Sequence, residues 1–112
     1  MSAQQAERLA SNQALFREVN ERMMALNERF EPDRAHSADF VCECSHLSCA
    51  EQIRMTLTAY TAIRSNPRWF LVAPSPEHVF PEIEDVVKRA DRYFVVEKRG
   101  AAGEVAEQAA SG

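Results

Sequence analysis

The stretch Phe40-Val41-Cys42-Glu43-Cys44-Ser45-His46-Leu47-Ser48-Cys49 holds all three cysteines of this 112-residue chain. An odd number of cysteines spaced Cys-x-Cys-x4-Cys does not suit a secreted disulfide scaffold. Residues 40–44 read as a short strand, and alternation along a strand places Cys42 and Cys44 on one face. With Cys49 on the following turn, three thiolates converge and suit a soft cation such as zinc, which takes four tetrahedral ligands.

The fourth ligand is expected from one of the three histidines. We favour His78, which follows a distant apolar segment, because structural zinc sites commonly join ligands from two separated parts of a chain. His46 is the alternative, although its position between two cysteines strains a local chelate, and His36 lies in a polar linker. The prediction is a structural zinc ion bound by Cys42, Cys44, Cys49 and His78.

Patterns on both sides of this stretch predict an α+β fold with a small, mainly antiparallel sheet and two short helices. Strands are expected over 40–44, 52–57, 69–72 (apolar throughout and therefore central) and 93–97, and helices over 3–30, 59–65 (capped by Thr58) and 82–90. The predicted organisation is an N-terminal helical arm (1–31), a linker (32–39), a zinc-binding domain (40–99) and a flexible tail (100–112).

Apolar residues of the N-terminal helix recur in steps of three and four, and Asn12 completes the series. This seam predicts either a coiled-coil dimer or a helix packed on its own domain, and the sequence leaves both open. We expect a protein partner, or a second copy of the chain, to bind through this helix. The seam consists of Leu9, Phe16, Val19, Met23, Leu26 and Phe30.

Composition and charge disfavour several classes of function. The net charge is −4, and a face that binds nucleic acid would need a net-basic cluster, so no nucleic acid is expected. No apolar run approaches the roughly 18 residues of a membrane span. The first residues lack the basic and apolar regions of a secretory signal. The odd number of cysteines, clustered within eight residues, leads us to expect a reducing cytoplasm. The three glycines, at 100, 103 and 112, form no phosphate-binding loop.

The function expected from these features is non-enzymatic: a zinc-stabilised regulatory or protein-interaction module. A zinc-thiolate redox sensor is the main alternative, because a bound thiolate is the form that oxidants attack. A small metal-dependent hydrolase is a further alternative, but it needs an open coordination position and a base, and Glu43 points to the face opposite the cysteines. The cysteines could also be small buried hydrophobic residues.

The chain resembles a group of small uncharacterised actinobacterial proteins over most of residues 7–99. The resemblance is carried by residues 40–44 with Cys49, by 57–64, by 70–74 with His78, and by 93–98. In that group the histidine usually follows the strand sooner, within Pro-Gly-His, whereas this chain has Pro74-Ser75-Pro76-Glu77-His78. The resemblance implies that the three cysteines and one histidine act as a set in a bacterial cytoplasm, and it implies no activity.

Overall fold

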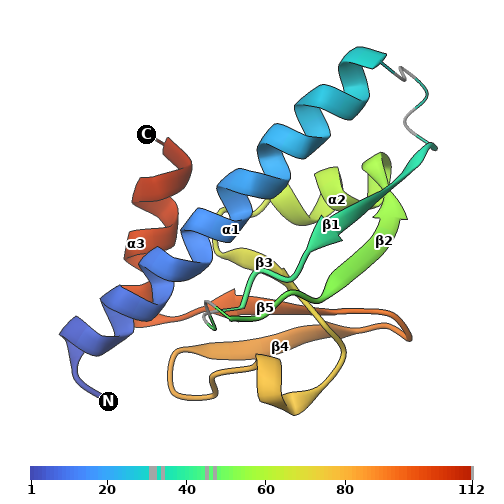
Figure 1. The fold of residues 1–112 in the computed structure, drawn as a ribbon. Coiled ribbons are helices and arrows are strands. Elements are labelled where there is room, and N and C mark those ends of the chain that lie inside the picture. Colours follow the sequence, from blue (N-terminus) through green and yellow to red (C-terminus); the bar gives the residue numbers. More distant parts are fainter. Residues whose placement is uncertain (31–32, 34, 45, 47, 112) are drawn as a thin grey trace.

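The computed structural model describes residues 1–30, 33, 35–44, 46 and 48–111, and its fold class is α+β, as predicted. A long helix crosses the molecule, and two antiparallel sheets and two shorter helices lie against it (Figure 1). The elements in chain order are α1 (Ala3–Phe30), β1 (Ser37–Val41), β2 (Gln52–Thr56), α2 (Leu57–Arg64), β3 (Trp69–Val72), the 3-10 turn η1 (Pro76–His78), β4 (Glu84–Arg89), β5 (Phe94–Lys98) and α3 (Gly100–Ser111).

The two sheets differ in size and in how their edges are covered. β1 pairs with β2 as a hairpin, whereas the second sheet has the order β3-β5-β4. The prediction of a central strand at 69–72 is therefore wrong, because β5 is central and β3 lies at an edge. Outside this sheet, the Glu43 backbone N–H donates to the Leu71 carbonyl at 2.7 Å, so the segment after β1 covers that edge. The cover explains why an edge strand is apolar throughout.

The helix predicted over 82–90 is instead strand β4, which pairs antiparallel with β5. Apolar residues at Ile83, Val86 and Val87 fit a helical face, but they are β-branched and suit a strand equally well. A register irregularity at Val87 leaves this side chain 43% exposed while Val86 faces Val96. Residues 84–89 form a strand because they pair with β5, and tertiary context commonly determines the structure of such short segments.

The first strand and the second helix begin earlier than the pattern indicates. β1 covers Ser37–Val41, so Cys42 and Cys44 lie just beyond its end and not within it. α2 is capped by Thr56, whose side chain accepts a hydrogen bond from the Ala59 backbone N–H, and not by Thr58. Buried residues of both sheets and α2 form the main core, including Phe40, Leu57, Tyr60, Phe70, Leu71, Val95 and Val96.

The most buried positions of α1 are ones that the heptad pattern does not include. Gln13 donates a hydrogen bond to Glu84 at 3.2 Å, and Asn20 donates to the Val41 carbonyl at 2.8 Å. Polar residues fit this face because its neighbours are backbone carbonyls and carboxylates. The predicted seam is divided. Val19, Leu26 and Phe30 are exposed, whereas Leu9 and Met23 are partly buried and pack against the core, and Phe16 is partly buried. The buried positions of α1 are Ala6, Ala10, Gln13, Arg17 and Asn20.

Residues 100–111, expected to be part of a flexible tail, form α3, which lies beside the N-terminal half of α1 (Figure 1). Ala102 and Ala106 are fully buried, and the Arg17 guanidinium donates to the Ala106 carbonyl at 3.0 Å. Small side chains let two helices approach closely, and a segment with few large apolar residues gives little sign of such packing. None of the helices in the described part of the chain combines the length and the apolar character that crossing a bilayer requires.

Candidate metal centre

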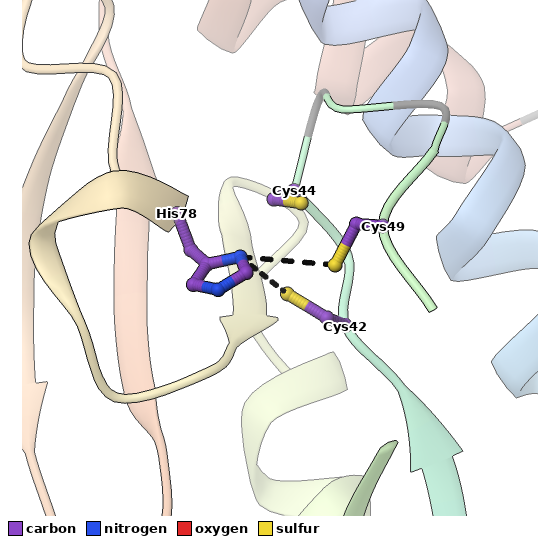
Figure 2. A group of neighbouring side chains, drawn as sticks. All are labelled: Cys42, Cys44, Cys49 and His78. Carbon is purple, nitrogen blue, oxygen red and sulfur yellow. Dashed lines mark hydrogen bonds between the residues drawn. The ribbon is translucent and has the colours of Figure 1, made fainter. Parts of the chain in front are cut away.

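Three cysteines and one histidine meet beyond the end of the β1–β2 hairpin. Cys42, Cys44 and Cys49 come from the connection between β1 and β2, and His78 closes the turn η1 (Figure 2). The sulfur atoms and the imidazole nitrogen of these four residues all lie within 4.8 Å of one another. The four residues are therefore close enough to bind a metal ion.

Backbone contacts hold the two segments in place. The Cys42 backbone N–H donates to the Glu51 carbonyl at 3.0 Å, which extends the β1–β2 pairing past the strand ends. The Cys49 backbone N–H donates to the His46 carbonyl at 3.0 Å and closes a turn. The His78 N–H donates to the Ser75 carbonyl at 3.2 Å, and the His78 imidazole faces the cysteines (Figure 2).

Two distances from His78 to the sulfurs can be compared with those of a tetrahedral metal site. Nδ1 of His78 lies 3.6 Å from Sγ of Cys42 and 3.7 Å from Sγ of Cys49 (Figure 2). Zinc bonds of about 2.3 Å to sulfur and about 2.0 Å to nitrogen, arranged tetrahedrally, place a sulfur and a nitrogen about 3.5 Å apart. Nδ1 is therefore the imidazole atom in position to bind an ion shared with the sulfurs.

Hydrogen bonds and burial shift the pKa values of the three thiols in different directions. A hydrogen bond from Cys42, with weaker ones from His78 and Cys49, lowers the pKa of Cys44 to about 4 despite burial. The same contact with Cys44, together with burial, raises the pKa of Cys42, and burial raises the pKa of Cys49. A metal that binds all three sulfurs displaces the protons that the thiols carry.

The other two histidines lie outside the cluster. Nε2 of His46 is 3.1 Å from the Glu77 carbonyl, and its ring packs on Phe80 at a centroid distance of 5.0 Å. His46 thus ties the cysteine-bearing segment to η1 without facing the sulfurs. His36 precedes β1 and lies near Leu26 at the far end of α1.

The backbone of β3 also supplies a hydrogen bond to the cluster, which the sequence pattern did not indicate. The Ala73 backbone N–H, just after β3, donates to Sγ of Cys42 at 3.2 Å. Bonds of this kind stabilise a thiolate and fix the direction of its lone pairs. The contact holds the Cys42 side chain, which lies outside a strand, against a donor 31 residues further along the chain.

Glu43 lies between two members of the cluster in sequence and faces the other way. Its buried carboxylate accepts hydrogen bonds from the Tyr60 hydroxyl at 2.5 Å, from Asn20 at 2.8 Å and from the Leu71 backbone N–H at 2.8 Å. The Arg64 guanidinium lies 3.8 Å from the same carboxylate. We call these five residues the Glu43 cluster. It fixes Cys42 and Cys44 from behind, because residues adjacent in an extended chain point in opposite directions.

An open cavity of about 790 Å³ lies beside the four residues and is lined in part by Cys49 and His78. These two residues are half-buried, whereas Cys42 is 1% exposed and Cys44 is fully buried. The candidate centre is thus closed on the side of its first two cysteines and open on the side of its third.

No family model, curated protein or solved structure matches this chain.

Proposed function

We propose that the chain binds one zinc ion through Cys42, Cys44, Cys49 and His78 and works as a non-enzymatic, zinc-stabilised interaction module. The convergence of these four side chains from two separate segments is the observation that carries the proposal. Three thiolates and one imidazole form a donor set typical of structural zinc. Soft sulfur donors favour zinc or iron over magnesium or calcium.

A structural role is supported over a hydrolytic one by the number and the charge of the donors. Four protein ligands fill a tetrahedral zinc site, whereas a hydrolytic site keeps a position open for water. Three thiolates also neutralise the charge with which the metal would polarise water. Glu43, the carboxylate nearest in sequence, faces α1 and α2 and is bonded to Asn20 and Tyr60.

The metal centre is expected to organise the surface on which α1 packs. Asn20 of α1 forms two hydrogen bonds with the backbone of Val41, both at 2.8 Å, and a third with Glu43. Val41 and Glu43 flank the ligand Cys42 on both sides. An ion that fixes Cys42 and Cys44 therefore also fixes the backbone groups to which α1 binds.

The outward face of α1 is the surface we propose for a protein partner or for a second copy of the chain. Large apolar side chains on this face are exposed: Leu15 by 58%, Val19 by 48%, Leu26 by 55% and Phe30 by 76%. We call these four residues the α1 stripe. A helix that exposes several large apolar residues on one side is typical of a binding surface.

We further propose that the chain works in a reducing cytoplasm, where its thiols stay free for metal, and that it is related to the small actinobacterial proteins that it resembles. The three cysteines are free in the structure, and their sulfurs face a common point instead of pairing. Both proposals follow from the sequence pattern, and the metal proposal does not depend on them.

The experiment that tests this function compares two histidine variants after purification without chelator. His78→Ala removes a proposed ligand and should reduce zinc content sharply from one ion per chain, as measured by elemental analysis. His46→Ala is the matched control, because His46 lines the same cavity but faces Glu77, and it should keep its zinc. Zinc that stays with His78→Ala would contradict the four-ligand site and favour a water in the fourth position.

A further inference from the structure

The two sides of the candidate centre differ in access to solvent. Cys42 is 1% exposed and Cys44 is fully buried, and Cys42 also accepts a hydrogen bond from the Ala73 backbone N–H. Cys49 is half-buried and lines the open cavity of about 790 Å³ together with His78. A small molecule that enters this cavity therefore meets the sulfur of Cys49 first.

We propose that Cys49 is the site at which hydrogen peroxide oxidises the metal centre, and that this oxidation releases the ion. The inference rests on the proposed function, since it concerns the regulation of the same site. Oxidation of cysteine depends on thiolate character and on exposure. Zinc holds all its sulfur ligands as thiolates, so exposure distinguishes Cys49 from the other two.

The reaction proceeds in two balanced steps. The Cys49 thiolate attacks one peroxide oxygen, the oxygen–oxygen bond breaks, and the products are a sulfenic acid on Cys49 and hydroxide. A second thiolate, from Cys42 or Cys44, then attacks the sulfenic sulfur, forms a disulfide and expels a second hydroxide. The two sulfurs lose two electrons in total and the peroxide gains them. The sulfur atoms start within 4.8 Å of each other, so a short movement brings them to bonding distance.

Loss of two thiolates from a site with four ligands leaves the ion with one sulfur and one imidazole. Such a pair binds zinc far more weakly than the complete set, so the ion dissociates. The cavity also carries the carboxylates of Glu51 and Glu77, which repel anionic oxidants. A small neutral peroxide is therefore the class of oxidant that this opening favours.

Two exchanges that keep four zinc ligands test the assignment. Cys49→His gives a site of two cysteines and two histidines and removes the accessible sulfur, whereas His78→Cys gives a site of four cysteines and keeps it. Zinc-loaded protein is treated with sub-denaturing peroxide, and released zinc is followed with a chromogenic chelator. The wild type and His78→Cys should release their zinc, and Cys49→His should release it at least about tenfold more slowly, because its remaining sulfurs are buried.

A second measurement on the wild type decides the matter if Cys49→His does not load with zinc. Dimedone traps sulfenic acids, and peptide mapping of zinc-loaded protein exposed briefly to peroxide should find the adduct on Cys49. An adduct on Cys42 or Cys44, or equal release rates from Cys49→His and the wild type, would overturn the inference. A wild type that takes up no zinc contradicts the proposed function itself, whereas a zinc-loaded wild type that keeps its metal under peroxide contradicts only the present inference.

Discussion

Residues 42–44 separate two clusters that hold the same piece of backbone in different ways. On one side, Cys42 and Cys44 join Cys49 and His78 in a group of metal-binding donors. On the other side, the carboxylate of Glu43 accepts three hydrogen bonds from protein groups, and every atom that it needs comes from the chain. The first cluster is completed by an ion in our proposal, and the second is complete as it stands.

The difference indicates which cluster can respond to conditions and which cannot. A buried carboxylate with three donors is fixed whenever the chain is folded, because leaving those donors unpaired costs free energy. A metal cluster has an occupancy that depends on metal supply, pH and oxidants. Because both clusters fix Cys42 and Cys44, we expect the effects of disturbing them to be non-additive, as is usual for groups in contact.

Removal of the metal should have the largest effect on the stability of the protein. Zinc sites of small domains contribute on the order of 10 kcal/mol in apparent terms, which is comparable to the whole stability of a domain of this size. We predict that chelation under reducing conditions lowers the melting temperature strongly and increases hydrogen exchange in α1 near Asn20. The measurement is thermal unfolding by circular dichroism, before and after chelation and after zinc is restored. An unchanged transition would mean that the Glu43 cluster alone holds residues 42–44.

Replacement of Glu43 should have the next largest effect. Glu43→Ala leaves Arg64 without its nearest carboxylate and removes the acceptor for Tyr60 and Asn20, all within the core. We predict a loss of about 3–5 kcal/mol in the free energy of unfolding of the zinc-loaded protein, the cost typical of breaking a buried pair. Glu51→Ala is the control, because Glu51 is an exposed carboxylate of the same connection, and it should lose less than about 0.5 kcal/mol. Denaturant unfolding measures the free energy of unfolding of both variants. Equal losses would show that the buried hydrogen bonds of Glu43 add no stability beyond that of an exposed carboxylate.

Tyr60 gives the Glu43 cluster a pH dependence at the alkaline end. Burial raises the pKa of this hydroxyl, and the negative charge of Glu43 raises it further. Since an unfolded tyrosine has a pKa of about 10, the unfolded chain releases this proton first, so the contribution of Tyr60 is present below about pH 10 and is lost above it. We predict that Tyr60→Phe is destabilised by about 1–2 kcal/mol at neutral pH and declines less steeply above about pH 10. Parallel alkaline slopes for the two proteins would argue against this role.

The smallest effect on stability is expected on the outward side of α1, away from both clusters. Leu26→Lys alters an exposed position of the α1 stripe, so the free energy of unfolding should change by no more than about 0.5 kcal/mol. If the stripe binds a second copy of the chain, the same variant should stay monomeric at concentrations where the wild type associates. Ala25→Lys, which is also exposed, is the control and should associate like the wild type. Sedimentation that finds only monomeric wild type would leave a different protein as the partner.

The grouping of the three cysteines with His78 was predictable because strand alternation and the usual donor set of a zinc site both apply to the sequence. Spacing placed Cys42 and Cys44 on one side of an extended segment, and the need for a ligand from a second segment selected His78 over His46. The α+β class followed in the same way from the alternating pattern at 52–56 and the apolar run at 69–72. These features follow from residue patterns and donor chemistry, and the structure keeps them.

Other features depend on partners that the sequence does not indicate. The heptad pattern of α1 is present in the sequence, but it does not mark the most buried face. That face carries Gln13, Arg17 and Asn20, because the groups beneath it are carbonyls and carboxylates. The role of Glu43 could not be predicted, because no spacing or donor rule selects Asn20 and Tyr60, 23 and 17 residues away, as its partners. The flexible tail predicted over 100–112 and the helix predicted over 82–90 were wrong for a related reason. An alanine-rich segment and a run of β-branched residues each fit more than one kind of element.

The most direct test of the zinc site is a joint count of metal and reactive thiols on protein purified without chelator under reducing conditions. We predict one zinc ion per chain, slow thiol labelling in the loaded protein, and rapid labelling of all three cysteines once the metal is removed and the chain is unfolded. Protein that contains no zinc and takes none up, with thiols equally reactive before and after chelation, would contradict the proposed site.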